Sequence, residues 1–326
     1  MARGAVASEG TELGRVPEIS VVIPTYNRAR LVAEAIDSAL AQTFADREIV
    51  VVDDGSTDAT EATLARYRER IRVVRKPNGG EASARNAGVR EARGTWIAFL
   101  DSDDRWEPAA LATLVAAARA RPEAGLVAMK ARAIAPSGAP TGRIHGKRSP
   151  GPLFTTRSLL MGDAGGVLMP MVRRDLLLGA GGFDESLTSA TDCDMWLRLS
   201  FATVMIGVPE PLLLCRAHEG SMSSDRGENA RMWLRILDKL GAEHPDWIAR
   251  NPRPFRRAVG KELLRLGRER LASWDGRPES LREARAALRR SIATTPLVPR
   301  AWLYLAWSVL APRGYGAWRR IELRHR

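Results

Sequence analysis

The sequence contains very little cysteine and no long apolar segment. Its 326 residues include only two cysteines, Cys193 and Cys215, which are too few for a disulfide framework and favour a reducing cytoplasm. The first 17 residues lack the apolar core of a secretory signal and are typical of a disordered leader. The longest near-apolar run of the C-terminal third, residues 301–311, is well short of the ~20 residues that a spanning helix needs. We therefore expect a cytoplasmic protein that does not cross a membrane.

Basic residues outnumber acidic ones only in the last third of the chain, and this excess produces the net charge of +12. Residues 228–326 contain 22 Lys and Arg against 10 Asp and Glu, whereas residues 1–227 contain 28 of each kind. This division predicts a neutral body and a basic C-terminal module that faces an anionic partner. Anionic lipid and acidic glycan are the favoured partners, because no recognised nucleic-acid motif accompanies the charge.

Strand-like apolar runs alternate with helical patterns in the first part of the chain. The expected strands are residues 19–24, 48–53, 71–75 and 95–100, and the expected helices are residues 29–43, 59–69, 81–92 and 108–120. This alternation predicts an α/β fold, with a mostly parallel sheet covered by helices on both faces. Residues 125–134 are expected to form a further strand, and the Pro/Gly/Arg-rich residues 135–152 an exposed loop.

The first strand-to-helix turn, residues 25–30, contains no glycine. A dinucleotide-binding turn needs a Gly-x-Gly-x-x-Gly pattern so that pyrophosphate can approach the helix N-terminus. A nicotinamide or flavin enzyme is therefore disfavoured. A phosphate group bound at this sheet would need another source of positive charge, such as a metal ion.

Crowded carboxylates follow the fourth expected strand, in the segment TWIAFLDSDDRWEP at residues 95–108. If the backbone there is extended, Asp101 and Asp103 point the same way and can share a hard divalent cation. The alternative is that Asp103 or Asp104 caps the helix that begins near Glu107. A cap uses only one carboxylate, so a metal or phosphate-linked role is favoured for the cluster.

Polar residues also follow the other expected strands, at the sheet edge where chemistry gathers in open α/β sheets. Asp53 and Asp54 can accept hydrogen bonds from a nucleobase or from ribose hydroxyls, or they can simply form a turn and a helix start. Gly79 and Gly80, preceded by Asn78, allow the backbone to come close to a ligand.

Four motifs in this order resemble glycosyltransferase family 2, the nucleotide-sugar transferases of GT-A fold. They are VVIPTYNR at residues 21–28, VVDDGSTD at residues 51–58, NGG with ARNAG at residues 78–88, and FLDSDD at residues 99–104. The resemblance covers about residues 18–224. It implies a GT-A domain at residues 18–227, followed by a basic helical region at residues 228–326.

The same resemblance implies the residues of a donor site. A nucleotide-sugar would be held by Pro24, Thr25, Tyr26, Asn27, Arg28, Asp53, Asp54, Asn78, Gly79, Arg85, Asp101 and Ser102. A divalent cation, Mn²⁺ or Mg²⁺, would be held by Asp101, Asp103 and His218, which lies in an Arg-x-His segment at residues 216–218. Asp101 can contact the ribose or the sugar instead of the metal, and the sequence leaves both roles open.

A candidate general base lies in the second half of the chain. Residues 181–198 resemble the family segment in which Glu-Asp precedes a helix ending in Leu-Arg, and Asp192 falls on the position of the catalytic Asp. Thr191 stands where Glu is usual. The alternative for Asp192 and Asp194 is helix-start stabilisation by acidic residues in the first turn. A single base implies a direct displacement that inverts the anomeric carbon.

The expected activity is metal-dependent, nonprocessive, inverting transfer from a nucleotide-diphosphate sugar, with UDP-linked donors first. The acceptor would be a hydroxyl in glycan, glycolipid or glycoprotein synthesis, such as that of cell envelope polysaccharide. Two alternatives remain, a nucleotidyltransferase and a noncatalytic nucleotide- or glycan-binding subunit. A nucleotidyltransferase would normally carry a Gly-rich basic loop after the first strand, which residues 25–30 do not provide.

The C-terminal third is expected to be helical and to carry no catalytic group. Residues 281–293 and 300–310 resemble one tetratricopeptide-like hairpin. The tail, residues 312–326, places Tyr315 and Trp318 among arginines, a composition suited to peripheral binding at an anionic membrane surface. The alternative is a solvated basic face that packs on the catalytic domain.

Overall fold

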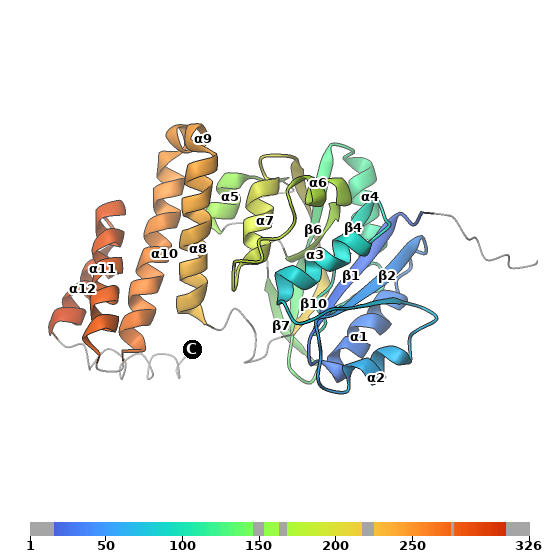
Figure 1. Cartoon of the computed structure of the whole chain (residues 1–326). Helices are drawn as coiled ribbons and strands as arrows, with labels where there is room; N and C mark the ends of the chain where they lie inside the picture. The colour runs from blue at the N-terminus through green and yellow to red at the C-terminus, as the bar shows by residue number, and fades with distance from the viewer. Residues whose placement is uncertain (1–15, 146–152, 163–167, 217–224, 275–276, 311–326) are drawn as a thin grey trace, which may run out of the picture.

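The computed structural model describes residues 16–145, 153–162, 168–216, 225–274 and 277–310. Figure 1 shows a twisted sheet flanked by helices, with a group of C-terminal helices standing beside it. The predicted α/β class and the C-terminal helices are confirmed. Within the described residues, no helix is both long enough and apolar enough to span a bilayer.

The first four strands pair in parallel, as the sequence predicts. They are β1 (Ile19–Thr25), β2 (Arg47–Asp53), β3 (Arg72–Arg75) and β4 (Trp96–Phe99), in the spatial order β3-β2-β1-β4. The helices that follow them are α1 (Ala29–Leu40), α2 (Thr60–Ala65), α3 (Glu81–Glu91) and α4 (Ala110–Ala120). In register, Thr25 at the end of β1 lies opposite Asp53 at the end of β2. The polar residues after each strand are thereby brought to one edge.

Helices cover both faces of this sheet because the strand side chains alternate between faces. Val50 and Val52 pack with Ala84 and Ala87 of α3, whereas Val51 belongs to the main core that also contains buried side chains of α1. A Cβ atom on Gly88 would lie 2.3 Å from Cγ1 of Val22. Glycine at this position therefore lets α3, which begins beside the polar sheet edge, lie close against β1.

The second half of the sheet is mixed. Strand β9 (Leu168–Arg173) lies antiparallel between β4 and β6 (Ala124–Ile134), and β10 (Val204–Arg216) runs parallel to β6. The short strands β5 (Arg105–Trp106) and β8 (Leu153–Phe154) pair antiparallel with β10. The sequence pattern of the first half did not reveal these reversals, because apolar alternation carries no information about strand direction.

The expected loop at residues 135–152 is wrong in part, because residues Pro140–His145 form strand β7, which pairs antiparallel with β6. A tight turn joins the two strands, and the amide of Gly138 donates to the carbonyl of Ala135 at 2.8 Å. Gly138 has φ +89°, a conformation that favours glycine. The Pro/Gly composition thus marks the turn of a hairpin, and its second strand, β7, is exposed and polar enough to resemble a loop.

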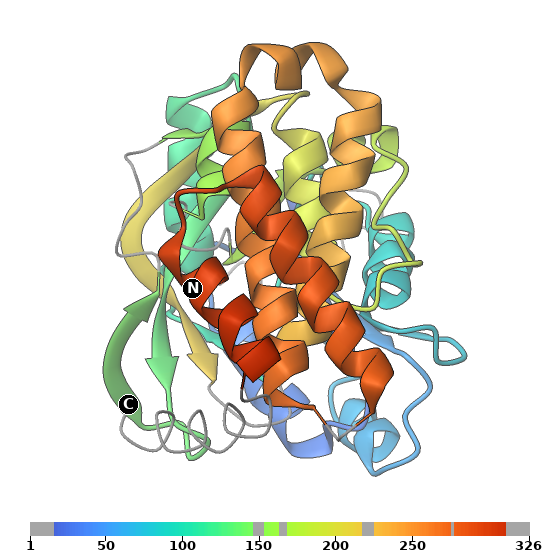
Figure 2. The same ribbon diagram turned by 90° about the vertical axis from the view of Figure 1, so that its left-hand side faces the viewer.

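The C-terminal helices pack first on the α/β part of the chain and then on one another (Figure 2). They are α8 (Arg226–Glu243), α9 (Pro245–Arg250), α10 (Pro252–Ala272), α11 (Pro278–Thr294) and α12 (Pro299–Leu310). The last two form the helical hairpin expected from the sequence. The membrane-binding tail proposed for residues 312–326 lies outside the described residues, as does nearly all of the expected leader.

Two apolar clusters join these helices to their neighbours. One cluster combines Leu160 of α5 (Thr156–Met161) and Leu197 of α7 (Thr191–Leu199) with side chains of α8 and α10. The other combines Leu271 of α10 with Leu288 of α11 and Tyr304 of α12. Because the first cluster spans residues on both sides of the expected boundary at residue 227, α8 and α10 form one packed unit with α5 and α7.

Candidate active site

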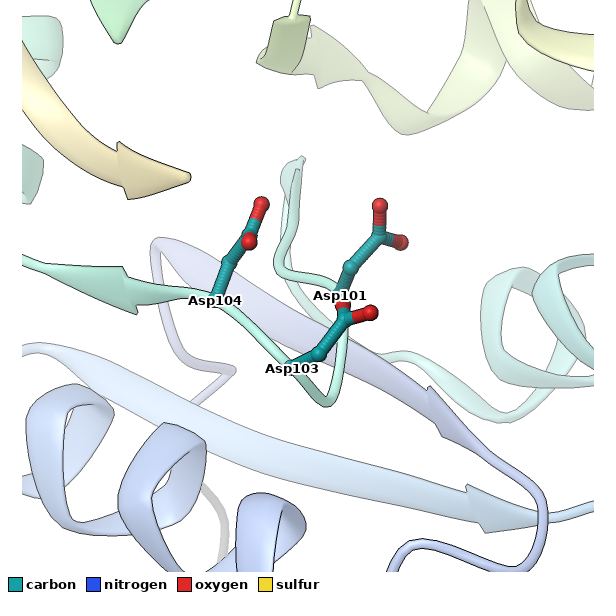
Figure 3. A group of neighbouring side chains, drawn as sticks. All are labelled: Asp101, Asp103 and Asp104. Atoms are coloured by element: carbon teal, nitrogen blue, oxygen red, sulfur yellow. The ribbon is translucent and has the colours of Figure 1, made fainter. Parts of the chain in front are cut away.

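Three aspartates project from one short turn at the end of β4 (Figure 3). One carboxylate oxygen from each of Asp101, Asp103 and Asp104 lies within 4.8 Å of the others. The predicted convergence of Asp101 and Asp103 is correct, but the expected reason for it is wrong. The backbone is not extended there, since the amide of Asp104 donates to the carbonyl of Asp101 at 3.0 Å and closes a turn.

Neither Asp103 nor Asp104 caps the following helix. Helix α4 begins at Ala110, and its N-cap, Ala109, makes no side-chain capping bond. The buried carboxylate of Asp104 instead accepts a hydrogen bond from the backbone amide of Arg216 at 2.8 Å. Asp104 therefore ties the end of β10 to the turn, which gives this residue a structural task of its own.

Each of the other two aspartates faces one arginine. Nη2 of Arg85 lies 2.9 Å from Oδ1 of Asp101, and Nη1 of Arg28 lies 2.9 Å from Oδ2 of Asp103. Burial and the charge of Asp103 raise the pKa of Asp101, although Arg85 opposes this shift. Burial and the two neighbouring carboxylates raise the pKa of Asp104 well above its usual value. Negative charge is thus crowded at this turn even with both arginines in place.

The end of β1 and the turn that follows it contain the predicted nucleotide-binding residues Pro24, Thr25, Tyr26, Asn27 and Arg28. Asn27 has φ +51°, and its side-chain oxygen accepts from the amides of Thr57 at 2.8 Å and Asp58 at 3.3 Å. Asn27 therefore fixes this turn against the loop that follows β2. The side chain of Tyr26 is 46% exposed beside it, which leaves an aromatic surface for a flat ligand such as a nucleobase.

The two aspartates after β2 have different surroundings. Asp53 is buried, and its Oδ1 accepts from the amide of Ser56 at 2.9 Å. Asp54 accepts from Lys76 at 2.5 Å and from the amides of Gly79 at 3.0 Å and Gly80 at 2.8 Å. Asp54 thus organises the Asn78–Gly80 loop at the start of α3, which supports the structural alternative that the sequence left open for this residue.

Asp192 lies at the start of α7 and shares the electrostatic environment of the aspartate turn. Its charge acts on Arg85 and Asp101, and its Oδ1 accepts from the amide of Cys193 at 2.8 Å. The first fact agrees with a role in the site, and the second agrees with the alternative of helix-start stabilisation. Thr191, next to it, is buried, and its hydroxyl has no hydrogen-bond partner among the described residues.

Three further residues from the sequence analysis are Ser102, Asp194 and His218. Ser102 is buried within the aspartate turn. Asp194 is 2% exposed and contacts Arg198 and Lys239. His218 lies outside the described residues, so its proposed contact with a metal stays a prediction.

Sequence reasoning missed Glu81, the first residue of α3. Its carboxylate pairs with Arg85, and burial together with the charges of Asp101, Asp192 and Asp103 raises its pKa to about 7. The sequence signal that could have identified Glu81 was its position directly after Gly79 and Gly80, at the N-terminus of a helix. Arg85 is almost fully buried between Glu81 and Asp101, so it is the central cation of the site.

The donor atoms of the aspartate turn suit a hard divalent cation. Carboxylate oxygens are the ligands that Mg²⁺ and Mn²⁺ prefer, and the three carboxylates lie close enough together to contribute to one site. Burial is the largest cause of the raised pKa values of Asp101 and Asp104, and the charges of neighbouring carboxylates add to it. Additional positive charge at this turn would oppose these shifts.

The fold is similar to those of solved glycosyltransferase structures. S. aureus TarS in complex with UDP-GlcNAc superposes with a TM-score of 0.66 at 20% identity, covering 94% of this chain and 92% of that chain. A mannosyltransferase from Pyrobaculum calidifontis, in complex with GDP-Man and Mn²⁺, gives a TM-score of 0.52 at 22% identity over 94% of this chain and 84% of that chain. The protein therefore has the GT-A fold of the nucleotide-sugar glycosyltransferases.

The sequence comparisons identify the family. The model of glycosyl transferase family 2 matches residues 20–166, and an uncharacterised glycosyltransferase from Rickettsia prowazekii is 30% identical over 263 residues, which cover 77% of this chain and 81% of that protein. The chain belongs to glycosyltransferase family 2. Hyaluronan synthase from Pasteurella multocida is 34% identical over 195 residues, but the match covers 59% of this chain and only 20% of the synthase.

Proposed function

We propose that this enzyme transfers a sugar from a nucleotide-diphosphate sugar to a hydroxyl acceptor in a metal-dependent, nonprocessive and inverting reaction. The observation that carries this proposal is the group of Asp101 and Asp103 after β4 with Arg85 of α3, together with the charge of Asp192, which acts on Arg85 and Asp101. The first three suit a diphosphate and its counter-ion, and the fourth suits a proton acceptor. Neither a nucleotidyltransferase nor a noncatalytic subunit would require all four groups.

The donor would lie across the ends of β1, β2 and β4. Tyr26 would stack on the base, and Asp53 would accept hydrogen bonds from the base or the ribose. The UDP-GlcNAc complex of TarS supports UDP-linked donors as the first choice. Asp101 and Asp103 would hold Mn²⁺ or Mg²⁺, which supplies neutralisation of the charge that develops on the departing nucleoside diphosphate.

Asp192 would act as the general base. It would accept the proton of the acceptor hydroxyl as that oxygen attacks the anomeric carbon and the bond to the diphosphate breaks on the opposite side. One bond forms and one breaks in a single displacement, so the configuration inverts and no enzyme nucleophile is needed. Arg85, which pairs with Asp101, would stabilise negative charge at the diphosphate.

The acceptor belongs to glycan, glycolipid or glycoprotein synthesis, with cell envelope polysaccharide as our first expectation. The charge of the C-terminal region supports an anionic acceptor or an anionic membrane surface. Loss of binding to vesicles containing anionic lipid after removal of residues 312–326 would support peripheral membrane attachment, whereas undiminished binding would exclude a role for this tail.

A donor screen tests the proposed function. We expect one or more UDP-sugars, in the presence of Mn²⁺, to raise the unfolding temperature of the protein, because a ligand of the folded state stabilises it. The same compounds should release UDP slowly in the absence of acceptor. Sugars linked to GDP, CDP and dTDP serve as comparisons. If no nucleotide-sugar stabilises the protein or is turned over with any divalent cation, the proposed activity is wrong.

A further inference from the structure

Helix α8 of the C-terminal region forms hydrogen bonds with the loop that leads into Asp192. Glu228, Arg235 and Lys239 are spaced seven and four residues apart, so they lie on one face of the helix. This polar face of α8 meets residues 184–194, which run from the loop into the first turn of α7. The contacts therefore form a ladder along the segment that carries the candidate base.

The ladder consists of three sets of hydrogen bonds, one for each of these side chains of α8. The hydroxyl of Thr188 donates to Oε1 of Glu228 at 2.7 Å. Arg235 donates to the carbonyl and the hydroxyl of Ser186 at 3.1 and 3.2 Å. Lys239 donates to Oδ2 of Asp184 at 3.1 Å and to Oδ1 of Asp194 at 3.2 Å.

Lys239 binds the buried carboxylate of Asp194, two residues after the candidate base Asp192. Asp194 is 2% exposed, and its second oxygen accepts from Nε of Arg198 at 2.9 Å. Arg198 in turn donates to the carbonyls of Ala180 at 2.6 Å and Gly182 at 2.8 Å. A buried carboxylate needs such compensation, so Lys239 and Arg198 together fix the first turn of α7.

The other end of the loop is attached to the donor side of the site. The amide of Phe183 donates to the side-chain oxygen of Asn86 at 2.7 Å, and the side-chain nitrogen of Asn86 donates to the carbonyl of Phe183 at 2.9 Å. Asn86 directly follows Arg85, which pairs with Asp101. The loop is therefore held between α3, which contributes to the donor site, and α8.

Apolar packing attaches α8 to the loop and to α7 independently of these hydrogen bonds. Met232, Ile236, Leu237 and Leu240 are buried in the cluster that contains Leu187 and Leu197. Such packing keeps the helices in contact. Hydrogen bonds between charged groups are directional, so they also restrain the orientation of the first turn of α7. Burial would raise the pKa of Asp184, but hydrogen bonds from Ser186 and Lys239 outweigh it and lower that pKa to about 2, so Asp184 stays ionised at neutral pH.

We infer that Lys239 is a positioning residue for Asp192, and that the polar face of α8 sets the distance between the base and the donor site. This inference rests on the proposed function, because it takes Asp192 as the base. It also makes the N-terminal helix of the basic region a part of the catalytic apparatus. The region beyond residue 227 is then not a separable module, although the sequence pattern suggests one.

The test compares the variants Lys239→Met and Lys239→Arg in the full chain. A displacement of about 1 Å at a catalytic group can reduce the rate about 100-fold, so we expect Lys239→Met to lower kcat by about 10- to 100-fold. The donor dissociation constant should remain unchanged, because no donor residue is altered. Lys239→Arg should restore most of the loss by keeping a cation between Asp184 and Asp194. Arg282→Met, an exposed arginine that pairs within α11, serves as a matched control and should leave kcat unchanged.

A double variant separates this inference from the proposed function. If Lys239 acts through Asp192, then Lys239→Met should add no further loss to the residual rate of Asp192→Asn. If the loss in the double variant equals the product of the two single losses, the positioning role is wrong. A normal kcat in a folded Lys239→Met protein would also overturn it. An active Asp192→Asn enzyme would instead overturn the base assignment. Should Lys239→Met not fold, the exposed Arg235→Met carries the same test, and its normal kcat would contradict the inference.

Discussion

Replacement of Asp192 by Asn is expected to lower the turnover number by about 10²- to 10⁴-fold, the range that general-base catalysis contributes. The amide can still accept the hydrogen bond that the carboxylate receives from Cys193, so the start of α7 should keep its geometry. It cannot take up the proton of the acceptor hydroxyl. Initial rates of sugar transfer, measured with saturating donor, provide the comparison.

Two controls accompany this variant. The dissociation constant of the donor should stay within about threefold of that of the wild-type protein, since a base contributes to the transition state more than to donor binding. Asp175→Asn, at an exposed aspartate that pairs with Arg173, should be fully active. Unchanged turnover in Asp192→Asn would mean that another group removes the proton, and weakened donor binding alone would assign Asp192 to the donor site.

Removal of the divalent cation is expected to abolish transfer, and Asp101→Asn and Asp103→Asn are each expected to lower kcat by about 10²- to 10³-fold, the usual cost of losing an electrostatic contact to developing charge. Both variants should require more Mn²⁺ for half-maximal activity. Asp101→Asn removes the ion pair with Arg85, and Asp103→Asn removes the ion pair with Arg28. Activity is measured against Mn²⁺ concentration after treatment with a chelator.

Asp104→Asn provides the matched comparison on the same turn. The asparagine oxygen can still accept from the amide of Arg216, so the link between β10 and the turn should persist. We expect the smallest change in Mn²⁺ dependence for this variant. Full activity after chelation would show that transfer does not need a divalent cation, and Arg85 and Arg28 would then be the groups that neutralise the diphosphate.

The position of the candidate site at the strand ends was a prediction from the sequence, because apolar runs show where the strands end. Parallel strands bring their carboxyl ends to one edge, so Asp53 and Asp101 had to lie on the same side of the sheet. The placement of Asp192 came from resemblance to a family motif, because no local pattern connects residue 192 with the end of β4. The structure brings its charge within reach of Arg85 and Asp101.

Contacts between distant segments account for what the sequence did not reveal. The antiparallel β9 and the β7 hairpin depend on pairing partners, which an apolar pattern does not specify. Burial raises the pKa of Glu81, and the charges of Asp101, Asp192 and Asp103, which are distant in the sequence, add to this shift. The ladder from α8 to residues 184–194 joins side chains 40 to 55 positions apart, and each of them taken alone resembles an ordinary surface charge.

The anomeric configuration of the product tests most directly whether Asp192 serves as the base in a single displacement. With a UDP-sugar in which the sugar is α-linked, the account predicts a β-linked product, identified by the coupling constant of the anomeric proton in the NMR spectrum. An α-linked product would contradict it, because retention requires either two displacements or attack from the side of the departing diphosphate.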